Sequence, residues 1–206
     1  MIALVDFGAG NLRSIENALA RLGVEPTIAA TPEMITEADA VILPGVGAAG
    51  PAMAALRDRG LDGAIVRTIH EGRPFLGICL GLQLLFARSA EDGTNCLGVL
   101  PGTVERLKTS EKLPHVGWNT IEVVRTHRLL TGVDGEAMYF VHSYVVVPDD
   151  GAIIAARTTH GTPFGSAIAI GSLVGVQFHP ERSGSAGLRL LENFIAIARV
   201  GAGHVA

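Results

Sequence analysis

Features that would mark a specialised class of protein are scarce in this sequence. The formal net charge of its 206 residues is −4, and no run of basic residues occurs. Proteins that bind nucleic acid or an anionic membrane surface need a positive patch, so we expect no nucleic acid and no membrane as a partner. No apolar stretch reaches membrane-spanning length without a glycine or a polar residue.

Cysteine is rare as well, with two in the chain, Cys79 and Cys96. The segment MIALVDFGAG at the start has no basic region and leads directly into a turn, which is typical of a first core strand and not of a signal peptide. We therefore expect a cytoplasmic protein with reduced cysteines. No histidine–cysteine group has the spacing of metal ligands, and we predict no metal or other cofactor.

Apolar residues and glycine are what the sequence does contain. Hydrophobic residues make up 48% of it, and there are 26 glycines, which indicates a compact, turn-rich protein. The length suffices for one domain with a sizeable core, and we expect residues 1–206 to form a single domain.

The first half of the chain alternates short apolar runs with segments of helical spacing. Strands are expected at residues 2–7, 40–43 and 74–78, and helices at residues 11–22, 48–59 and 65–72. Strands that alternate with helices imply right-handed crossovers and a largely parallel sheet covered on both faces.

From Cys96 to Phe178 the pattern changes to closely spaced β-type runs: NTIEVV, MYFVHSYVVV, AIIAAR, AIAI and LVGVQF. A hairpin is expected around Gly171 and Ser172, and helical spacing returns at residues 187–200. We therefore predict an α/β fold in which helices flank a mixed, largely parallel central sheet that carries an antiparallel β extension.

The segment FLGICLGLQLLF places a cysteine between two glycines where a strand should pass into a helix. Gly77 and Gly81 fit the tight turn of a nucleophile elbow, with Cys79 at the carboxyl end of a parallel strand. A helix beginning at Leu80 would direct its dipole and free N–H groups at the sulfur, which favours the thiolate. The alternative interpretation of Cys79 is a cysteine that only packs in the core. We assign that packing role to Cys96, which lacks the frame of two glycines, one on each side, that surrounds Cys79.

A base for this nucleophile is expected at His179, in the segment VGVQFHPERS. Pro180 keeps His179 out of helical geometry, and in an extended segment Glu181 points to the same side as His179. The carboxylate would then hold one tautomer of the imidazole and stabilise its protonated form. His142 is the rival base, but it lies within a strand and has no acid two residues away, so we expect a core or substrate-facing histidine there. The remaining histidines are expected at the surface or at helix ends: His70, His115, His127, His160 and His204.

The segment GVGAAG matches the glycine pattern of dinucleotide-binding loops. It follows a later strand instead of the first one, and no acid ends the next strand, so the dinucleotide interpretation is the weakest. A tight turn into a helix is a second interpretation. We favour a third, in which this loop directs a backbone N–H at the same oxyanion as the N–H of Leu80.

These segments together resemble the triad (class I) glutamine amidotransferases, in which GICLGLQLL, PGVG and FHPE occur in this order. Within that family, DFGAGNLRS, PGVGAAGPAM, LPHVGWN, YFVHSY and GVQFHPERS are similar to the glutaminase subunits of imidazole glycerol phosphate synthases. The matches extend from residue 6 to residue 194. PHVGWN and YFVHSY are specific to that branch, whereas the cysteine elbow alone indicates the larger family.

The resemblance implies a class I glutamine amidotransferase fold and a cysteine-based hydrolysis of L-glutamine to glutamate and ammonia. Cys79 would attack the side-chain amide, His179 would protonate the leaving ammonia, and Glu181 would orient His179. The resemblance further implies oxyanion donors at Leu80, Val46 and Gly47, and glutamine-holding positions at Gly47, Gln83, Ser143 and Tyr144.

The resemblance also implies a partner. Ammonia would pass to a separate (β/α)₈-barrel cyclase subunit, in a heterodimer that makes imidazole glycerol phosphate and aminoimidazole carboxamide ribonucleotide in histidine biosynthesis. The positions implied at or near the cyclase-facing surface are Asn11, Arg13, Trp118, Asn119, Tyr139 and Arg182.

Two alternatives differ in their predictions. A glutaminase that serves another pathway would carry other interface segments than PHVGWN. A redox sensor or a non-catalytic binding protein would need neither the His179–Glu181 pair nor Gln83.

Overall fold

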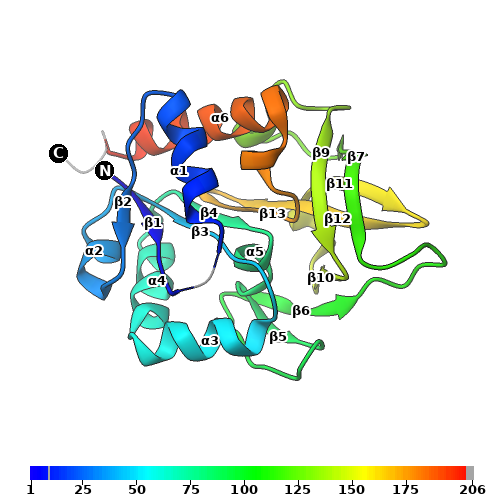
Figure 1. The fold of residues 1–206 in the computed structure, drawn as a ribbon, viewed down its shortest axis with the longest axis horizontal. Coiled ribbons are helices and arrows are strands. Elements are labelled where there is room, and N and C mark those ends of the chain that lie inside the picture. The colour runs from blue at the N-terminus through cyan, green and yellow to red at the C-terminus, as the bar shows by residue number, and fades with distance from the viewer. Residues whose placement is uncertain (9, 203–206) are drawn as a thin grey trace.

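The computed structural model describes residues 1–8 and 10–202, and Figure 1 shows its central sheet between layers of helices. The eight strands of this sheet have the order β2-β1-β3-β4-β13-β12-β11-β8. The strands from β2 to β13 in this order are parallel: β2 (Thr27–Ala29), β1 (Ile2–Val5), β3 (Ala40–Leu43), β4 (Phe75–Ile78) and β13 (Leu173–Val176). The predicted mixed, largely parallel sheet is thus confirmed.

The remaining strands of the large sheet are antiparallel. They are β12 (Thr162–Ile170), β11 (Ile154–His160) and β8 (Glu122–Val123). β12 and β13 form the predicted hairpin, in which Ile170 pairs with Leu173 across a two-residue turn, and Gly171 adopts a φ of 57° there.

Two small sheets make up the rest of the β extension. One contains β5 (Phe86–Ser89), β6 (Leu100–Arg106) and β10 (Tyr144–Pro148). The other pairs β7 (His115–Thr120) with β9 (Ala137–His142) in antiparallel register. The run MYFVHSYVVV, which we expected as one segment, is therefore two strands in different sheets that separate at Ser143.

Helices cover both faces of the large sheet (Figure 1). α1 (Leu12–Arg21) and α6 (Gly184–Ala202) pack on one face, and α3 (Ala49–Asp58) and α4 (Leu61–His70) on the other. Alternation along β1 divides the core accordingly, because Leu4 belongs to the cluster of α1 and α6 while Val5 belongs to that of α3 and α4. The shorter elements are α2 (Pro32–Thr36), α5 (Leu80–Gln83), η1 (Arg128–Leu130), η2 (Gly151–Ile153) and η3 (Pro180–Arg182).

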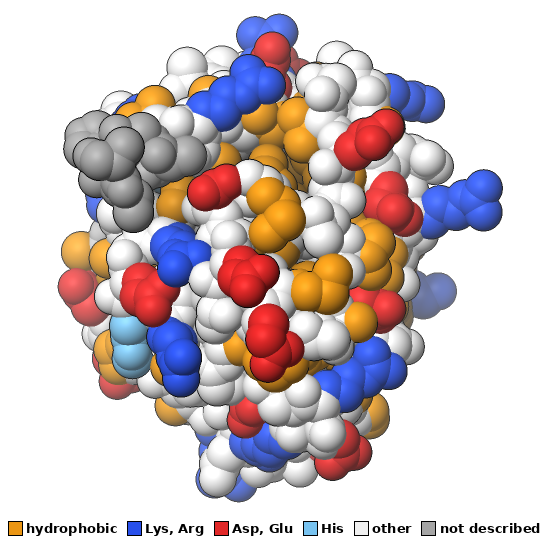
Figure 2. All heavy atoms as spheres, turned by 90° about the vertical axis from the view of Figure 1, so that its left-hand side faces the viewer, with side chains coloured by type: hydrophobic (Ala, Val, Ile, Leu, Met, Phe, Trp, Pro, Cys, Tyr) orange, Lys and Arg blue, Asp and Glu red, His pale blue; other side chains and the backbone are white. Residues whose placement is uncertain are grey.

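Positive-φ glycines end the N-terminal helices where the pattern predicted. Gly23 adopts a φ of 73° just after α1, and Gly60, with a φ of 67°, separates α3 from α4. None of the helices that the structure describes combines the length and apolar character needed to cross a lipid bilayer. Figure 2 shows the side on which β2 and α2 lie, where acidic and basic side chains are interspersed as on an ordinary solvated surface.

Candidate active site

Three neighbouring parallel strands end at the same edge of the large sheet, and each delivers one part of the site. β3 leads into the loop Gly45–Val46–Gly47, β4 into Cys79, and β13 into His179. The carboxyl edge of a parallel sheet is where α/β proteins bind ligands. Residues separated by a hundred positions in the sequence therefore lie together because β13 returns beside β4.

Cys79 occupies a strained turn at the end of β4. Its φ of 54° and ψ of −108° make it a non-glycine residue with positive φ, a conformation that persists only where the surroundings enforce it. A methyl group on Gly81 would lie 1.9 Å from the Leu43 carbonyl oxygen, and one on Gly77 would lie 2.8 Å from the Gly81 oxygen. The glycine frame therefore exists because backbone segments approach closely on both sides of the cysteine.

The helix after Cys79 is shorter than we expected. α5 is a single turn, Leu80–Gln83, after which the chain enters β5 at Phe86. One turn has a weaker dipole than the helix we predicted, so the helix contributes less to the charge on the sulfur.

Replacing Gly81 with alanine should lower the free energy of unfolding by roughly 3 kcal/mol or more, because its new methyl group and the Leu43 carbonyl cannot occupy the same space. Gly63 within α4 provides the matched control, since nothing lies within 4 Å of a methyl group there. Gly63→Ala should stabilise the protein by up to about 1 kcal/mol. Denaturant unfolding measures both values, and equal effects at the two glycines would contradict the account of the turn.

The His179 and Glu181 side chains contact each other directly. His179 Nδ1 lies 2.8 Å from Glu181 Oε1, and both side chains are buried, with exposed fractions of 5% and 1%. His179 itself is extended, with a φ of −105° and a ψ of 95°. Glu181, however, lies in the 3₁₀ turn η3 and not in an extended segment. The expected neighbours thus meet through a turn that begins at Pro180.

The charge state of His179 depends on both its neighbours. Burial alone lowers the pKa of the imidazole, but hydrogen bonding and the negative charges of Cys79 and Glu181 outweigh it and raise the pKa from 6.5 to about 10. Nε2 is buried without a hydrogen bond of ordinary geometry, although the Cys79 sulfur is near enough to raise the pKa. This arrangement favours a protonated imidazole beside the Cys79 sulfur at neutral pH.

The loop Gly45–Val46–Gly47 lies against the turn at Cys79. The Gly45 carbonyl, however, faces the position where we expected a backbone N–H of this loop. The Leu80 N–H donates to the Gly45 oxygen at 3.4 Å. Because C=O and N–H of a trans peptide point in opposite directions, the N–H of Val46 is directed away from Leu80 N–H. Two of the expected oxyanion donors are therefore not aimed at a common point in this conformation, and rotation of the Gly45–Val46 peptide would release the Leu80 N–H.

A hollow of about 460 Å³ lies in front of the cysteine. Its lining brings together the sequence-predicted residues Val46, Gly47, Cys79, Leu80, Gln83, Ser143 and Tyr144, with Arg182 at the same hollow. Gln83 Nε2 donates to the Tyr144 carbonyl at 3.0 Å and to Gln177 Oε1 at 3.1 Å.

Gln177 is a site residue that the sequence reasoning missed. Its Nε2 atom lies 3.6 Å from the Cys79 sulfur, and the residue is completely buried. A hydrogen-bond donor beside the sulfur stabilises the thiolate. The one available signal was a polar residue inside the apolar strand run VGVQF.

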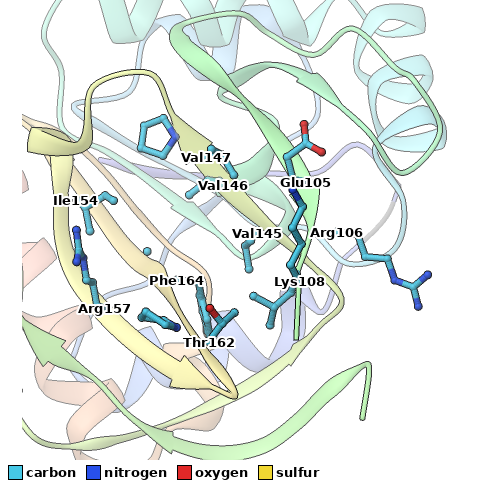
Figure 3. A pocket seen from close by; sticks show the side chains of 14 residues that line it. Glu105, Arg106, Lys108, Val145, Val146, Val147, Ile154, Arg157, Thr162 and Phe164 are labelled. Carbon is cyan, nitrogen blue, oxygen red and sulfur yellow. The ribbon is translucent and has the colours of Figure 1, made fainter. Parts of the chain in front are cut away.

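A second hollow, of about 470 Å³, lies away from this chemistry between β6, β10 and β12 (Figure 3). Val145, Val146 and Phe164 form part of its lining, with Arg157 on one side and Lys108 on the other. No cysteine or histidine is among the residues that line it. Cys79 lines the other hollow, which is therefore the candidate active site.

The other histidines divide into two groups. His70 is exposed at the end of α4, as expected, and His127 accepts a hydrogen bond from the N–H of Leu129 at η1. The surface expectation is wrong for His115, which is 4% exposed. His160 is half-buried and stacked on the His115 ring. His142 is buried and lines the hollow at Cys79, which confirms the expectation of a core or substrate-facing histidine. His204 lies outside the described residues.

Cys96 differs from Cys79 in its surroundings. It is half-buried, and burial raises the pKa of its thiol to about 11. A thiol with so high a pKa is protonated at neutral pH and is a poor nucleophile.

An aromatic and cationic cluster faces outward next to the site. The Arg182 guanidinium lies over the Tyr139 ring at 4.4 Å, and the Trp118 ring contacts Tyr139 edge-on at 6.1 Å between centroids. Trp118 is 58% exposed. Exposed aromatic and arginine side chains are enriched at protein interfaces. Of the other residues implied at the partner surface, Asn11 and Arg13 are exposed and Asn119 is half-buried.

Comparison with known proteins identifies the family of this chain. The family model "Glutamine amidotransferase class-I" matches residues 3–198. The chain is 48% identical to "Imidazole glycerol phosphate synthase subunit HisH" of Dehalococcoides mccartyi over 200 residues, 96% of this chain and 98% of that protein. It is 46% identical to the protein of the same name from Methanothermobacter thermautotrophicus, with coverage of 97% and 100%.

Solved structures show the same fold. A structure described as a glutamine amidotransferase superimposes with a TM-score of 0.78 at 23% identity, covering 97% of this chain and all of that one. The structure of PurLQS from Thermotoga maritima gives a TM-score of 0.77 at 19% identity, with coverage of 95% and 97%.

Proposed function

Because this chain belongs to the class I glutamine amidotransferases, and within them to the HisH subunits of imidazole glycerol phosphate synthase, we propose that Cys79, His179 and Glu181 hydrolyse L-glutamine to supply ammonia for histidine biosynthesis. The observation that carries the proposal is that the adjacent strands β4 and β13 lead into Cys79 and His179, with the Cys79 sulfur near enough to raise the His179 pKa and His179 Nδ1 2.8 Å from Glu181 Oε1. We treat residues 1–206 as one glutaminase domain.

The first half-reaction begins with the thiolate. The Cys79 sulfur attacks the side-chain amide carbon of glutamine, and the C=O electrons move onto the oxygen to give a tetrahedral oxyanion. When this intermediate collapses, the C–N bond breaks and His179 transfers its proton to the leaving nitrogen. The products are ammonia, a glutamyl thioester on Cys79 and a neutral imidazole.

The second half-reaction returns the site to its starting state. Neutral His179 takes a proton from water as the water oxygen attacks the thioester carbon, and collapse of the second oxyanion breaks the C–S bond. Glutamate leaves, with the thiolate and the protonated imidazole restored. Glu181 stabilises the imidazole through Nδ1 in the protonated state and fixes the ring orientation.

Glutamine would lie in the hollow in front of Cys79. We propose that Gly47, Gln83, Ser143 and Tyr144 hold it there and that Leu80, with Val46 or Gly47, donates to the oxyanion. Gln83 Nε2 donates to the Tyr144 carbonyl and to Gln177 Oε1, which fixes the orientation of the Gln83 amide and leaves its Oε1 as the acceptor available to an amino acid substrate.

We further propose that the ammonia passes to a HisF-type (β/α)₈ cyclase subunit, which converts it into imidazole glycerol phosphate and aminoimidazole carboxamide ribonucleotide. The outward cluster of Trp118, Tyr139 and Arg182 supports a docking surface at this site, together with Asn11, Arg13 and Asn119.

Mixing the chain with a cyclase subunit and its nucleotide substrate tests the function as a whole. Glutamate and imidazole product should form together, and glutamine consumption without imidazole product would contradict the assignment.

Replacing Glu181 with glutamine should lower the pKa of His179 from about 10 towards its ordinary value, because one charge that raises it is removed. NMR titration of the ring nitrogens measures this pKa.

The same shift sets the pH dependence of stability. The pKa of His179 in the folded state lies above the ordinary 6.5. The stabilisation that protonated His179 gives the folded state is therefore fully present below pH 6.5 and is lost as the pH rises through about 10. Glu181→Gln should reduce this alkaline loss, and an unchanged His179 titration in the variant would contradict the role of Glu181.

A further inference from the structure

Two buried histidines outside the triad form a direct pair across β7 and β9, the strands that also carry Trp118 and Tyr139. His115 on β7 and His142 on β9 are 4% and 6% exposed, and His115 Nδ1 lies 3.0 Å from His142 Nε2. The antiparallel register of β7 and β9 places them opposite each other. The mechanism proposed above uses neither side chain.

The pair is one section of a longer chain of hydrogen bonds that reaches the hollow at Cys79. His142 Nδ1 lies 3.0 Å from the Tyr144 carbonyl oxygen, which also accepts from Gln83 Nε2 at 3.0 Å. At the other end, Asn119 Nδ2 lies 3.2 Å from His115 Nε2. His142 itself lines the hollow.

The donors and acceptors of this chain fix one tautomer for each ring. A carbonyl can only accept, so His142 must carry its proton on Nδ1 and present Nε2 as an acceptor. His115 must therefore donate from Nδ1, which leaves its Nε2 as the acceptor for the Asn119 amide. That amide orientation is fixed independently, because Asn119 Nδ2 donates to the Thr159 carbonyl at 2.9 Å and Asn119 Oδ1 accepts from the Thr120 N–H at 2.8 Å.

Both rings are held in their neutral forms by their surroundings. Burial and then the neighbouring His160 lower the pKa of His115 to about 4. Burial, followed by the charge of His115, lowers the pKa of His142 to about 3. Phe140 and Phe164 pack on the rings and keep water away. At neutral pH, the hydrogen-bond chain therefore keeps a single direction of donation, from Asn119 towards the Tyr144 carbonyl.

We infer that His142, held by His115, is a positioning residue for glutamine, because it fixes the Tyr144 carbonyl and through it the Gln83 amide at the wall of the substrate hollow. The inference rests on the proposed function, which supplies the substrate. His142 contacts neither the sulfur nor the imidazole of the triad in any hydrogen bond of the described residues, so its effect falls on substrate binding and not on the chemical step.

The test compares kcat and KM for glutamine in the complex with the cyclase subunit. His142→Phe keeps the ring and removes the donor to Tyr144, and it should raise KM about tenfold while changing kcat by less than about threefold. His142→Asn restores a donor close to the Nδ1 position and should recover most of the wild-type KM. A merely structural role would lower the amount of active enzyme, and hence kcat, and leave KM unchanged.

His160→Phe is the matched control. His160 stacks on the same His115 ring at 4.1 Å between centroids, but its Nε2 pairs with the Lys112 carbonyl and not with a member of the hydrogen-bond chain. Its KM should equal that of the wild type. An unchanged KM in His142→Phe, or an equal rise in His160→Phe, would overturn the inference while leaving glutamine hydrolysis at Cys79 intact.

A measurement on the unaltered protein provides a second arm if a variant fails to fold. Nitrogen-15 NMR of the histidine rings should show both His115 and His142 neutral and protonated on Nδ1 near neutral pH. A proton on Nε2 of either ring would contradict the assigned donors and acceptors of the hydrogen-bond chain and would overturn the inference. Failure of the proposed function has a different signature, namely wild-type protein that releases no glutamate in the presence of the cyclase subunit.

Discussion

Replacing Cys79 with alanine should abolish glutamine-dependent synthesis of imidazole glycerol phosphate, with a loss of at least about 10³-fold in rate. Among the described residues that line the hollow, Cys79 carries the one thiol that can form the glutamyl thioester, and no oxyanion donor or base replaces a missing nucleophile. The cyclase subunit, assayed with ammonium in place of glutamine, should retain its activity in the complex with this variant. Coupled assays of glutamate and imidazole product measure both effects.

Cys96→Ala is the matched control for this experiment. Cys96 lies outside the hollow and its raised pKa keeps it protonated, so its removal should leave glutamine-dependent synthesis within about twofold of wild type. Glutamate release by Cys79→Ala, or its loss in Cys96→Ala, would show that the nucleophile has been assigned to the wrong residue.

Binding of the cyclase subunit with its nucleotide should raise glutaminase kcat by about 10²–10³-fold over the free chain. The physical reason lies in the 3.4 Å hydrogen bond between the Leu80 N–H and the Gly45 oxygen. While it exists, this N–H is occupied and the N–H of Val46 points elsewhere, so neither of these two donors reaches the developing oxyanion. Rotation of the Gly45–Val46 peptide would supply both at once.

The free chain should accordingly bind glutamine and hydrolyse it slowly, because the substrate hollow is formed while the oxyanion donors are not. Steady-state kinetics with and without the cyclase subunit should place most of the difference in kcat. Activation that appears in KM alone would contradict this account, since it would locate the missing element in substrate binding.

Much of the fold followed from apolar patterns, and the failures have identifiable causes. Ala40–Leu43 was predicted at its observed bounds because a buried parallel strand is continuously apolar. Thr27–Ala29 was missed because a three-residue edge strand is half-buried and carries little pattern. Phe86–Ser89 was hidden because the residues before it continue a helical spacing beyond the single turn that forms.

The site shows the same division between local and non-local information. The glycine frame around Cys79 and the proline after His179 act on the adjacent backbone, so the sequence alone indicated them. The burial of His115 depends on His142, which lies 27 positions away and pairs with it only after β7 and β9 meet. The orientation of the Gly45 carbonyl is likewise a matter of one backbone rotation, which no residue type encodes.

The most direct test of the central claim is covalent labelling with an electrophilic glutamine analogue in the presence of the cyclase subunit, read by peptide mass spectrometry. The account predicts one equivalent of label on the peptide that carries Cys79, protection by glutamine, and loss of labelling in a His179→Ala variant. Label on Cys96, or labelling of Cys79 that neither glutamine nor the loss of His179 alters, would contradict it.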